Sequence, residues 1–157
     1  MGAFEYRQAL EIRDACRREQ VRYLFLGKSG AILLGYPDTT QDADLYVERS
    51  PDNGRRLVAA LASLGFDLTP QQEEEIVRGK DFVQIRSGPF DLDLVFAPDG
   101  IERFSDAWDR RVEVNEFPVC SLDDIIVSKR AANRQKDRES LPRLEAFRVW
   151  LREQHQS

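Results

Sequence analysis

Residues 21–47, VRYLFLGKSGAILLGYPDTTQDADLYV, carry the pattern that decides the fold. The run 21–26 is β-branched and aromatic and stops at a glycine, which predicts a buried strand. The sequence GKSG at 27–30 predicts a turn, and the apolar run 31–34 predicts a short helix that a glycine and a proline soon end. Residues 42–47 then alternate polar and apolar side chains, as a strand with one functional face would.

The other elements are recognised by their hydrophobic periodicity and by their start and stop residues. They are a first helix ending before Val21, a helix over 50–65, an antiparallel hairpin of 82–85 with 90–96, a proline-containing edge segment at 117–120, a helix capped by Ser121, and a final helix carrying 141–151. Strands mixed with helices on a partly antiparallel sheet predict an α+β fold of the α/β type. We expect a small mixed β-sheet flanked by helices, with helices at the C-terminus.

The composition is that of a globular protein. A length of 157 residues predicts a single domain over 1–157, and 41% hydrophobic with 32% charged residues predicts a packed core. No apolar run approaches the roughly 20 residues of a membrane span, and the start lacks a signal peptide, so we expect a cytoplasmic protein with no membrane partner. Two cysteines, Cys16 and Cys120, are too few for a zinc site or a disulfide framework.

A basic cluster stands out from a chain with a net charge of −5. It spans SKRAANRQKDR at 128–138 and contains Lys129, Arg130, Arg134, Lys136 and Arg138. The whole surface offers no attraction for a polyanion, so a nucleic acid would have to be held by such a local patch. A solvated helix face is the other interpretation of this cluster.

Two pairs of aspartates share the same spacing. Asp42 and Asp44 are two residues apart on a predicted strand, so their carboxylates face the same side with Cα atoms about 7 Å apart. Asp91 and Asp93 repeat the spacing in a second strand. Carboxylates that share a face repel one another unless a cation lies between them. All-oxygen ligands favour Mg²⁺, with Mn²⁺ as the alternative ion, and an exposed strand face is the alternative to a metal site.

The turn at Gly27, Lys28 and Ser29 lies between a buried strand and a helix start, where backbone N–H groups favour a phosphate. The upstream glycine of a P-loop is missing, so a purely structural turn is the alternative. A phosphate-binding turn followed by metal-binding carboxylates is what an enzyme acting on a nucleoside triphosphate requires.

Two ordered sets of residues resemble the motifs of one enzyme family. The first set is Leu26-Gly27-Lys28-Ser29, Gly35-Tyr36-Pro37, Thr40 and Asp42-Ala43-Asp44-Leu45. The second is Pro118-Val119-Cys120-Ser121-Leu122-Asp123-Asp124-Ile125-Ile126, Lys129-Arg130-Ala131-Ala132, Arg134 and Lys136-Asp137. They resemble the DNA polymerase β-type nucleotidyltransferases, and more narrowly the minimal bacterial branch related to AbiEii-type toxins. The chain departs from the family pattern at Lys28, Asp38 and Ala43.

This resemblance implies a role for each matching position. Asp42 and Asp44 would hold the metal, with Asp93 as the third carboxylate and Asp91 as the alternative. The triphosphate would be bound by Gly27, Lys28, Ser29, Lys129 and Arg130, and Asp137 would complete the catalytic pocket. Independently of the resemblance, the charge of the basic cluster fits contact with an RNA backbone, and we expect Arg134 and Lys136 to contact an RNA acceptor.

The implied reaction transfers a nucleoside monophosphate from an NTP to an acceptor hydroxyl. The resemblance favours a tRNA 3′ end as acceptor and a toxin role with a cognate antitoxin protein as partner. A protein hydroxyl is an alternative acceptor. A non-catalytic nucleotide- or partner-binding module, and a metal-dependent phosphohydrolase or nuclease, are competing functions. The sequence leaves open which NTP is used and whether the chain self-associates.

Overall fold

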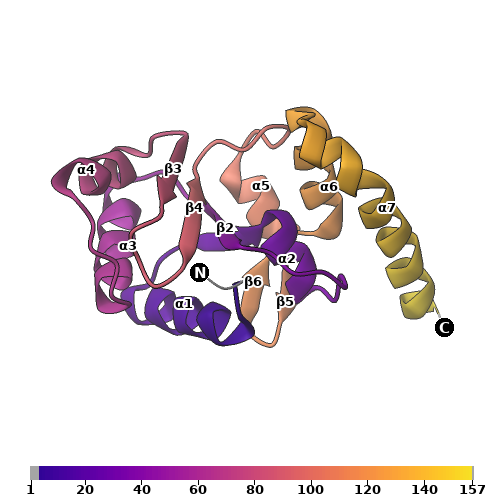
Figure 1. The fold of residues 1–157 in the computed structure, drawn as a ribbon, viewed down its shortest axis with the longest axis horizontal. Coiled ribbons are helices and arrows are strands. Elements are labelled where there is room, and N and C mark those ends of the chain that lie inside the picture. The colour runs from indigo at the N-terminus through magenta and orange to yellow at the C-terminus, as the bar shows by residue number, and fades with distance from the viewer. Residues whose placement is uncertain (1–3, 157) are drawn as a thin grey trace.

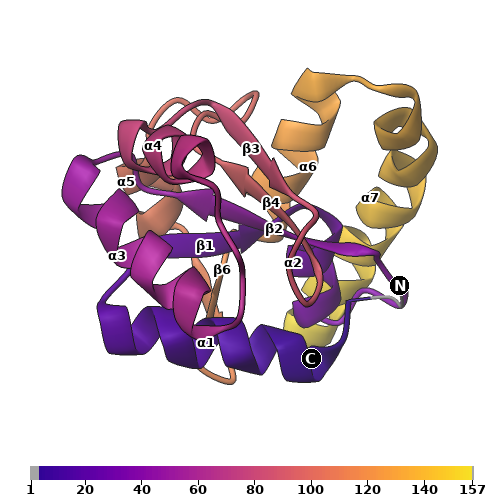
Figure 2. The same ribbon diagram turned by 60° about the vertical axis from the view of Figure 1, so that its left-hand side comes forward.

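The computed structural model describes residues 4–156, which form one six-stranded sheet with helices on both faces (Figures 1 and 2). The helices are α1 (Tyr6–Glu19), α2 (Gly27–Leu33), α3 (Pro51–Ser63), α4 (Pro70–Arg78), α5 (Phe104–Asp109), α6 (Leu122–Ala132) and α7 (Gln135–Gln156). The strands are β1 (Tyr23–Leu26), β2 (Asp42–Val47), β3 (Phe82–Ile85), β4 (Asp91–Val95), β5 (Val112–Val114) and β6 (Phe117–Val119). This mixed sheet with C-terminal helices confirms the predicted fold class.

The strand order is β3-β4-β2-β1-β6-β5. Neighbours in sequence pair antiparallel, namely β1 with β2, β3 with β4, and β5 with β6. The strands β2 and β4 pair in parallel, as do β1 and β6. The parallel pairing of β2 with β4 sets the two aspartate-bearing strands side by side.

The two faces of the sheet are covered differently. Helices α1, α3 and α4 pack on one face against inward residues such as Phe25 and Leu45. Helices α2, α5, α6 and α7 pack on the other face, against Leu24, Leu26 and Tyr46. Figures 1 and 2 show the first group on one side of the sheet and α6 with α7 on the other. The apolar cluster that these four helices form with the sheet contains no residue of β3 or β4. The face of β3 and β4 on this side of the sheet therefore stays open and borders a cleft.

Local signals account for the helix starts. The Ser50 hydroxyl accepts a hydrogen bond from the Asn53 N–H at 3.1 Å, and the Ser121 hydroxyl accepts one from the Asp124 N–H at 3.1 Å. The predicted hairpin of β3 and β4 is confirmed. None of the helices within 4–156 combines the length and apolar character needed to cross a membrane.

Two predictions at this level were wrong. The GKSG sequence forms the first turn of α2 itself, since the helix begins at Gly27. The segment at 117–120 is not an edge, because β5 pairs outside β6 and takes the edge position. Pro118 is tolerated there because β6 matches β1 at a single register position, Phe25 with Val119, so few hydrogen bonds are demanded of it.

Candidate functional site

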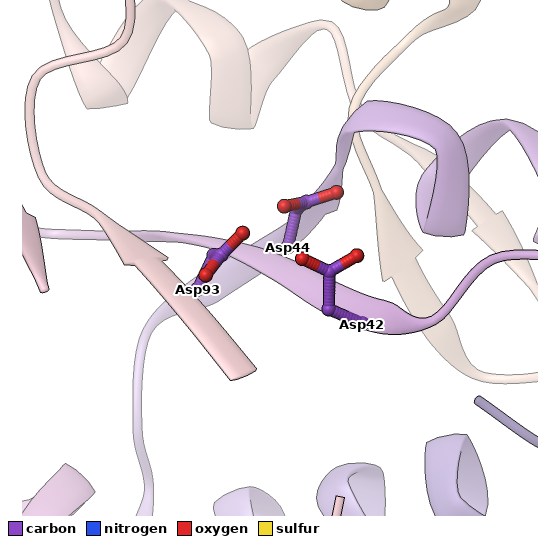
Figure 3. Close-up of side chains that lie close together, drawn as sticks. All are labelled: Asp42, Asp44 and Asp93. Atoms are coloured by element: carbon purple, nitrogen blue, oxygen red, sulfur yellow. The ribbon is translucent and has the colours of Figure 1, made fainter. Parts of the chain in front are cut away.

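Three carboxylates converge on the open half of the sheet. Asp42 and Asp44 project from β2, and Asp93 projects from the adjoining strand β4, as Figure 3 shows. The parallel register pairs Asp44 with Asp93 and Asp42 with Asp91. One carboxylate oxygen from each of Asp42, Asp44 and Asp93 lies within 4.8 Å of the others. The structure therefore brings together the three residues that we expected to hold a metal.

Burial and mutual repulsion make this cluster electrostatically unfavourable on its own. Burial, followed by the charges of Asp42 and Asp93, raises the pKa of Asp44 well above its ordinary value. Burial and then the neighbouring Asp42 raise the pKa of Asp93 to about 6. Such carboxyls either take up protons or bind a cation, and a divalent cation suits three oxygen donors at this spacing.

One arginine neighbours the cluster. Arg86 follows β3, and its Nη1 lies 3.0 Å from Asp93 Oδ1. Its Nη2 lies 3.8 Å from Asp42 Oδ2, and its Nε lies 4.0 Å from Asp91 Oδ2. The sequence analysis missed this residue. Its position at the end of a strand paired with β4 was the only signal, and that pairing had to be known first.

The start of α2 is built around β2. Gly27 has a φ of 62°, and a Cβ at this position would lie 2.4 Å from Asp44 Oδ2, so only glycine fits beside the aspartate. The Ser29 hydroxyl donates to Leu26 O at 3.0 Å and accepts from the Asp44 N–H at 3.0 Å. Ser29 is buried, and both bonds tie the helix start to β2. Lys28, which lies between Gly27 and Ser29 in the sequence, lines the cleft.

A second ionic group lies at the junction of α6 and α7. Asp137 is fully buried, and its carboxylate accepts hydrogen bonds from the Arg134 side chain at 2.7 Å and from the Arg134 N–H at 3.1 Å. Burial alone would raise the pKa of Asp137, but the bonds from Arg134 hold that pKa below its ordinary value. Lys129 Nζ lies 3.6 Å from the same carboxylate. Asp137 thus acts as a buried anchor for two cations at the cleft.

The open half of the sheet forms the floor of a cleft of about 730 Å³. Eight of the predicted site residues line this cleft, namely Gly27, Lys28, Asp42, Asp44, Asp93, Lys129, Arg134 and Lys136. Ser29 and Asp137 are buried next to lining residues. Arg130 is not among the lining residues, and its guanidinium pairs with Glu145 on α7. The structure therefore does not bring Arg130 to the proposed phosphate site.

Sequence reasoning also missed two cleft residues on β3. Phe82 and Gln84 point to the same side of the sheet as the aspartates, and both line the cleft. Gln84 pairs in register with Asp93. Phe82 and Gln84 alternate with buried Val83 and Ile85, and this alternation could be seen in the sequence. That Phe82 and Gln84 share a face with Asp93 follows only from the pairing of β3 with β4.

Comparisons with known proteins show a shared fold. No protein-family profile and no curated protein sequence matches the chain. A crystal structure of a Thermotoga maritima protein described as a "putative nucleotidyltransferase" matches with a TM-score of 0.54 and 16% sequence identity. The match covers 94% of this chain and 92% of that chain. The two chains therefore share one fold over nearly their whole lengths.

Proposed function

We propose that the chain is a metal-dependent nucleotidyltransferase. The observation that carries the proposal is the convergence of Asp42, Asp44 and Asp93 on one open sheet face, within 4.8 Å of one another. The arrangement lies beside a glycine-containing helix start and a partly buried lysine, Lys129. The shared fold with a protein described as a nucleotidyltransferase supports the same conclusion.

The residues present fit a divalent metal. The donors are all carboxylate oxygens, which Mg²⁺ and Mn²⁺ prefer. Asp93 Oδ1 is buried without a hydrogen bond and has Arg86 as its ion-pair partner, so the site contains a carboxylate oxygen whose hydrogen-bonding capacity is unused. Asp42, Asp44 and Asp93 would hold the ion. When bound, such an ion neutralises charge on the phosphate oxygens and on the pyrophosphate leaving group.

The cations of the cleft would bind the triphosphate. Lys28 on α2 and Lys129 on α6 both line the cleft, and Asp137 fixes the position of Lys129. Burial lowers the pKa of Lys129, whereas the carboxylates of Asp137 and Asp44 oppose this change. Ser29 would contribute by positioning β2, since its hydroxyl already makes two hydrogen bonds.

The reaction is a single displacement at the α-phosphorus. The acceptor hydroxyl oxygen forms a bond to the α-phosphorus, and the bond from that phosphorus to the β-phosphate oxygen breaks, releasing pyrophosphate. Asp93 would orient the hydroxyl and accept its proton. Lys129 would stabilise the negative charge that develops on the phosphates.

We further propose RNA as the acceptor. Arg134 and Lys136 line the cleft at the junction of α6 and α7, where an RNA backbone could be held. By the resemblance in sequence, a tRNA 3′ end is the favoured acceptor and a toxin with a cognate antitoxin the favoured biological role. Expression should then arrest growth, and Asp42→Ala should relieve the arrest.

The test incubates the purified protein with Mg²⁺, each α-³²P-labelled NTP in turn, and total bacterial RNA. Label in a tRNA-sized band together with pyrophosphate release is the expected result, and Asp42→Ala should abolish both. Label in protein would replace the RNA acceptor with a protein hydroxyl. Phosphate release without transfer would indicate a hydrolase, and NTP binding without any reaction would indicate a non-catalytic module.

A further inference from the structure

Four aspartates lie together on β2 and β4, and three of them contact the guanidinium of Arg86. Besides the three convergent aspartates, Asp91 lies opposite Asp42 in the parallel register. Arg86 approaches Asp42, Asp91 and Asp93 with nitrogen–oxygen distances between 3.0 and 4.0 Å. The second aspartate pair therefore contains one member inside the proposed metal triad and one member outside it.

We infer that Arg86 is the counter-ion of the triad before metal binds, and that Asp91 is the carboxylate that retains Arg86 once the metal is in place. Both would then be positioning residues for the reaction. The inference rests on the proposed function, because it takes Asp42, Asp44 and Asp93 as the metal ligands.

Arg86 and a metal ion would use the same oxygens. Arg86 Nη1 lies 3.0 Å from Asp93 Oδ1, and a magnesium ion needs its carboxylate oxygens at about 2.1 Å. The contact of Arg86 with Asp93 Oδ1 is an ion pair without well-aligned hydrogen-bond geometry. The Arg86 side chain is also 43% exposed, so solvent weakens its ion pairs. A divalent ion can therefore displace it.

Asp91 is placed to receive the displaced group. Its Oδ2 lies 4.0 Å from Arg86 Nε, and its Oδ1 is buried without a hydrogen-bond partner. A buried carboxylate oxygen without a donor is costly, and a guanidinium that turns toward Asp91 would satisfy it. Arg86 Nη1 also donates to Leu92 O at 3.4 Å, which keeps the guanidinium next to β4 throughout.

This arrangement gives each member of the second aspartate pair its own task. Asp93 binds the metal and the acceptor proton, and Asp91 keeps the positive charge of Arg86 away from the ion. Removing Arg86 should make metal binding tighter, since a competing cation is lost. It should also destabilise the metal-free protein, since Asp42, Asp91 and Asp93 would then lack their counter-ion.

The test measures Mn²⁺ affinity by calorimetry, and thermal unfolding in EDTA, for the wild-type protein, Arg86→Gln, Asp91→Asn and the double variant. Arg86→Gln should bind Mn²⁺ about tenfold more tightly, as expected for a unit charge about 5 Å from a divalent ion in a solvated site. The same variant should unfold at a lower temperature in EDTA. Arg86→Lys should stay close to wild type, because it keeps the charge.

Asp91→Asn should weaken Mn²⁺ binding in the wild-type background and have an effect at least threefold smaller in the Arg86→Gln background. Arg55→Gln is the matched control, because Arg55 is paired with Asp52 on α3 and the variant loses the same net charge. Its Mn²⁺ affinity should be that of wild type.

Unchanged or weaker Mn²⁺ binding in Arg86→Gln would overturn the inference, as would an equal effect of Asp91→Asn in both backgrounds. Both results would leave the proposed metal site intact, because the wild-type protein would still bind. A wild-type protein that binds no Mn²⁺ at millimolar concentration would instead reject the metal site, and the inference with it.

Discussion

Replacing Asp93 with asparagine should stabilise the metal-free protein at neutral and alkaline pH. Burial and the neighbouring Asp42 raise the pKa of Asp93 from its ordinary 3.8 to about 6, against the opposing effect of Arg86. The folded protein therefore holds this proton more tightly than the unfolded chain does. The stability from the neutral carboxyl is fully present below pH 3.8 and is lost as the pH rises through 6.

The size of the effect follows from that difference. Because the pKa of Asp93 is about 2 higher in the folded than in the unfolded protein, ionising this carboxyl lowers the free energy of unfolding by about 3 kcal/mol at pH 8. Solvent in the open cleft reduces this figure, and the variant also loses the ion pair of Asp93 with Arg86, worth up to about 1 kcal/mol. A net gain of about 1 kcal/mol remains, which raises the unfolding temperature by about 2–4 °C in a domain of this size.

Thermal unfolding followed by circular dichroism checks this prediction at pH 8 and pH 5 in EDTA, and at pH 8 with magnesium. The gain of Asp93→Asn should be present at pH 8 and shrink at pH 5, where the wild-type carboxyl is mostly protonated. Magnesium should reverse the order, because only the wild-type protein gains from binding. Asp67→Asn, which changes an exposed carboxylate, is the control. An Asp93→Asn protein less stable than wild type at pH 8 in EDTA would refute the reasoning.

Three further predictions concern individual positions. Gly27→Ala should weaken Mn²⁺ binding at least about tenfold in a calorimetric titration, because the new Cβ meets Asp44 and the positive φ strains the backbone. Lys129→Ala should raise the KM for NTP by about 10- to 100-fold. Arg130→Ala should change this KM less than about twofold, because Arg130 does not line the cleft and pairs with Glu145. Equal effects of the two variants would count against the assigned phosphate site. Burial raises the pKa of Cys16 to about 12, so this thiol should react with a disulfide reagent at pH 8 only after unfolding, and rapid labelling of the native protein would contradict the structure.

The strand alternation made much of the metal site predictable. Residues two apart on a strand face the same side, so Asp42 had to point with Asp44, and Asp91 with Asp93. The choice between the members of the second pair depends on register, which no local pattern encodes. The observed pairing sets Asp93 opposite Asp44, where the three carboxylates converge.

The wrong edge prediction, the missed Arg86 and the position of Arg130 all depend on long-range structure. Strand β5 joins β6 through Asn115 and Glu116, which both have positive φ values, and this tight turn contains no glycine to mark it. Arg86 meets the aspartates only because β3 pairs with β4. Arg130 follows Lys129 directly in the basic cluster, but pairs with Glu145 on the neighbouring helix. In each case the partner lies in another element.

The open half of the sheet explains why the fold can carry this site. A helix packed over β3, β4 and the first half of β2 would bury four carboxylates with one arginine, which leaves a large uncompensated charge in a medium of low dielectric constant. Helices α2, α5, α6 and α7 instead gather over the apolar side chains of β1, the end of β2 and Cys120, which follows β6. The same edge of α6 that completes this cluster brings Lys129 to the cleft. Apolar packing on one half of the sheet thus places a cation beside the aspartates on the other half, where solvent, metal and substrate can reach them.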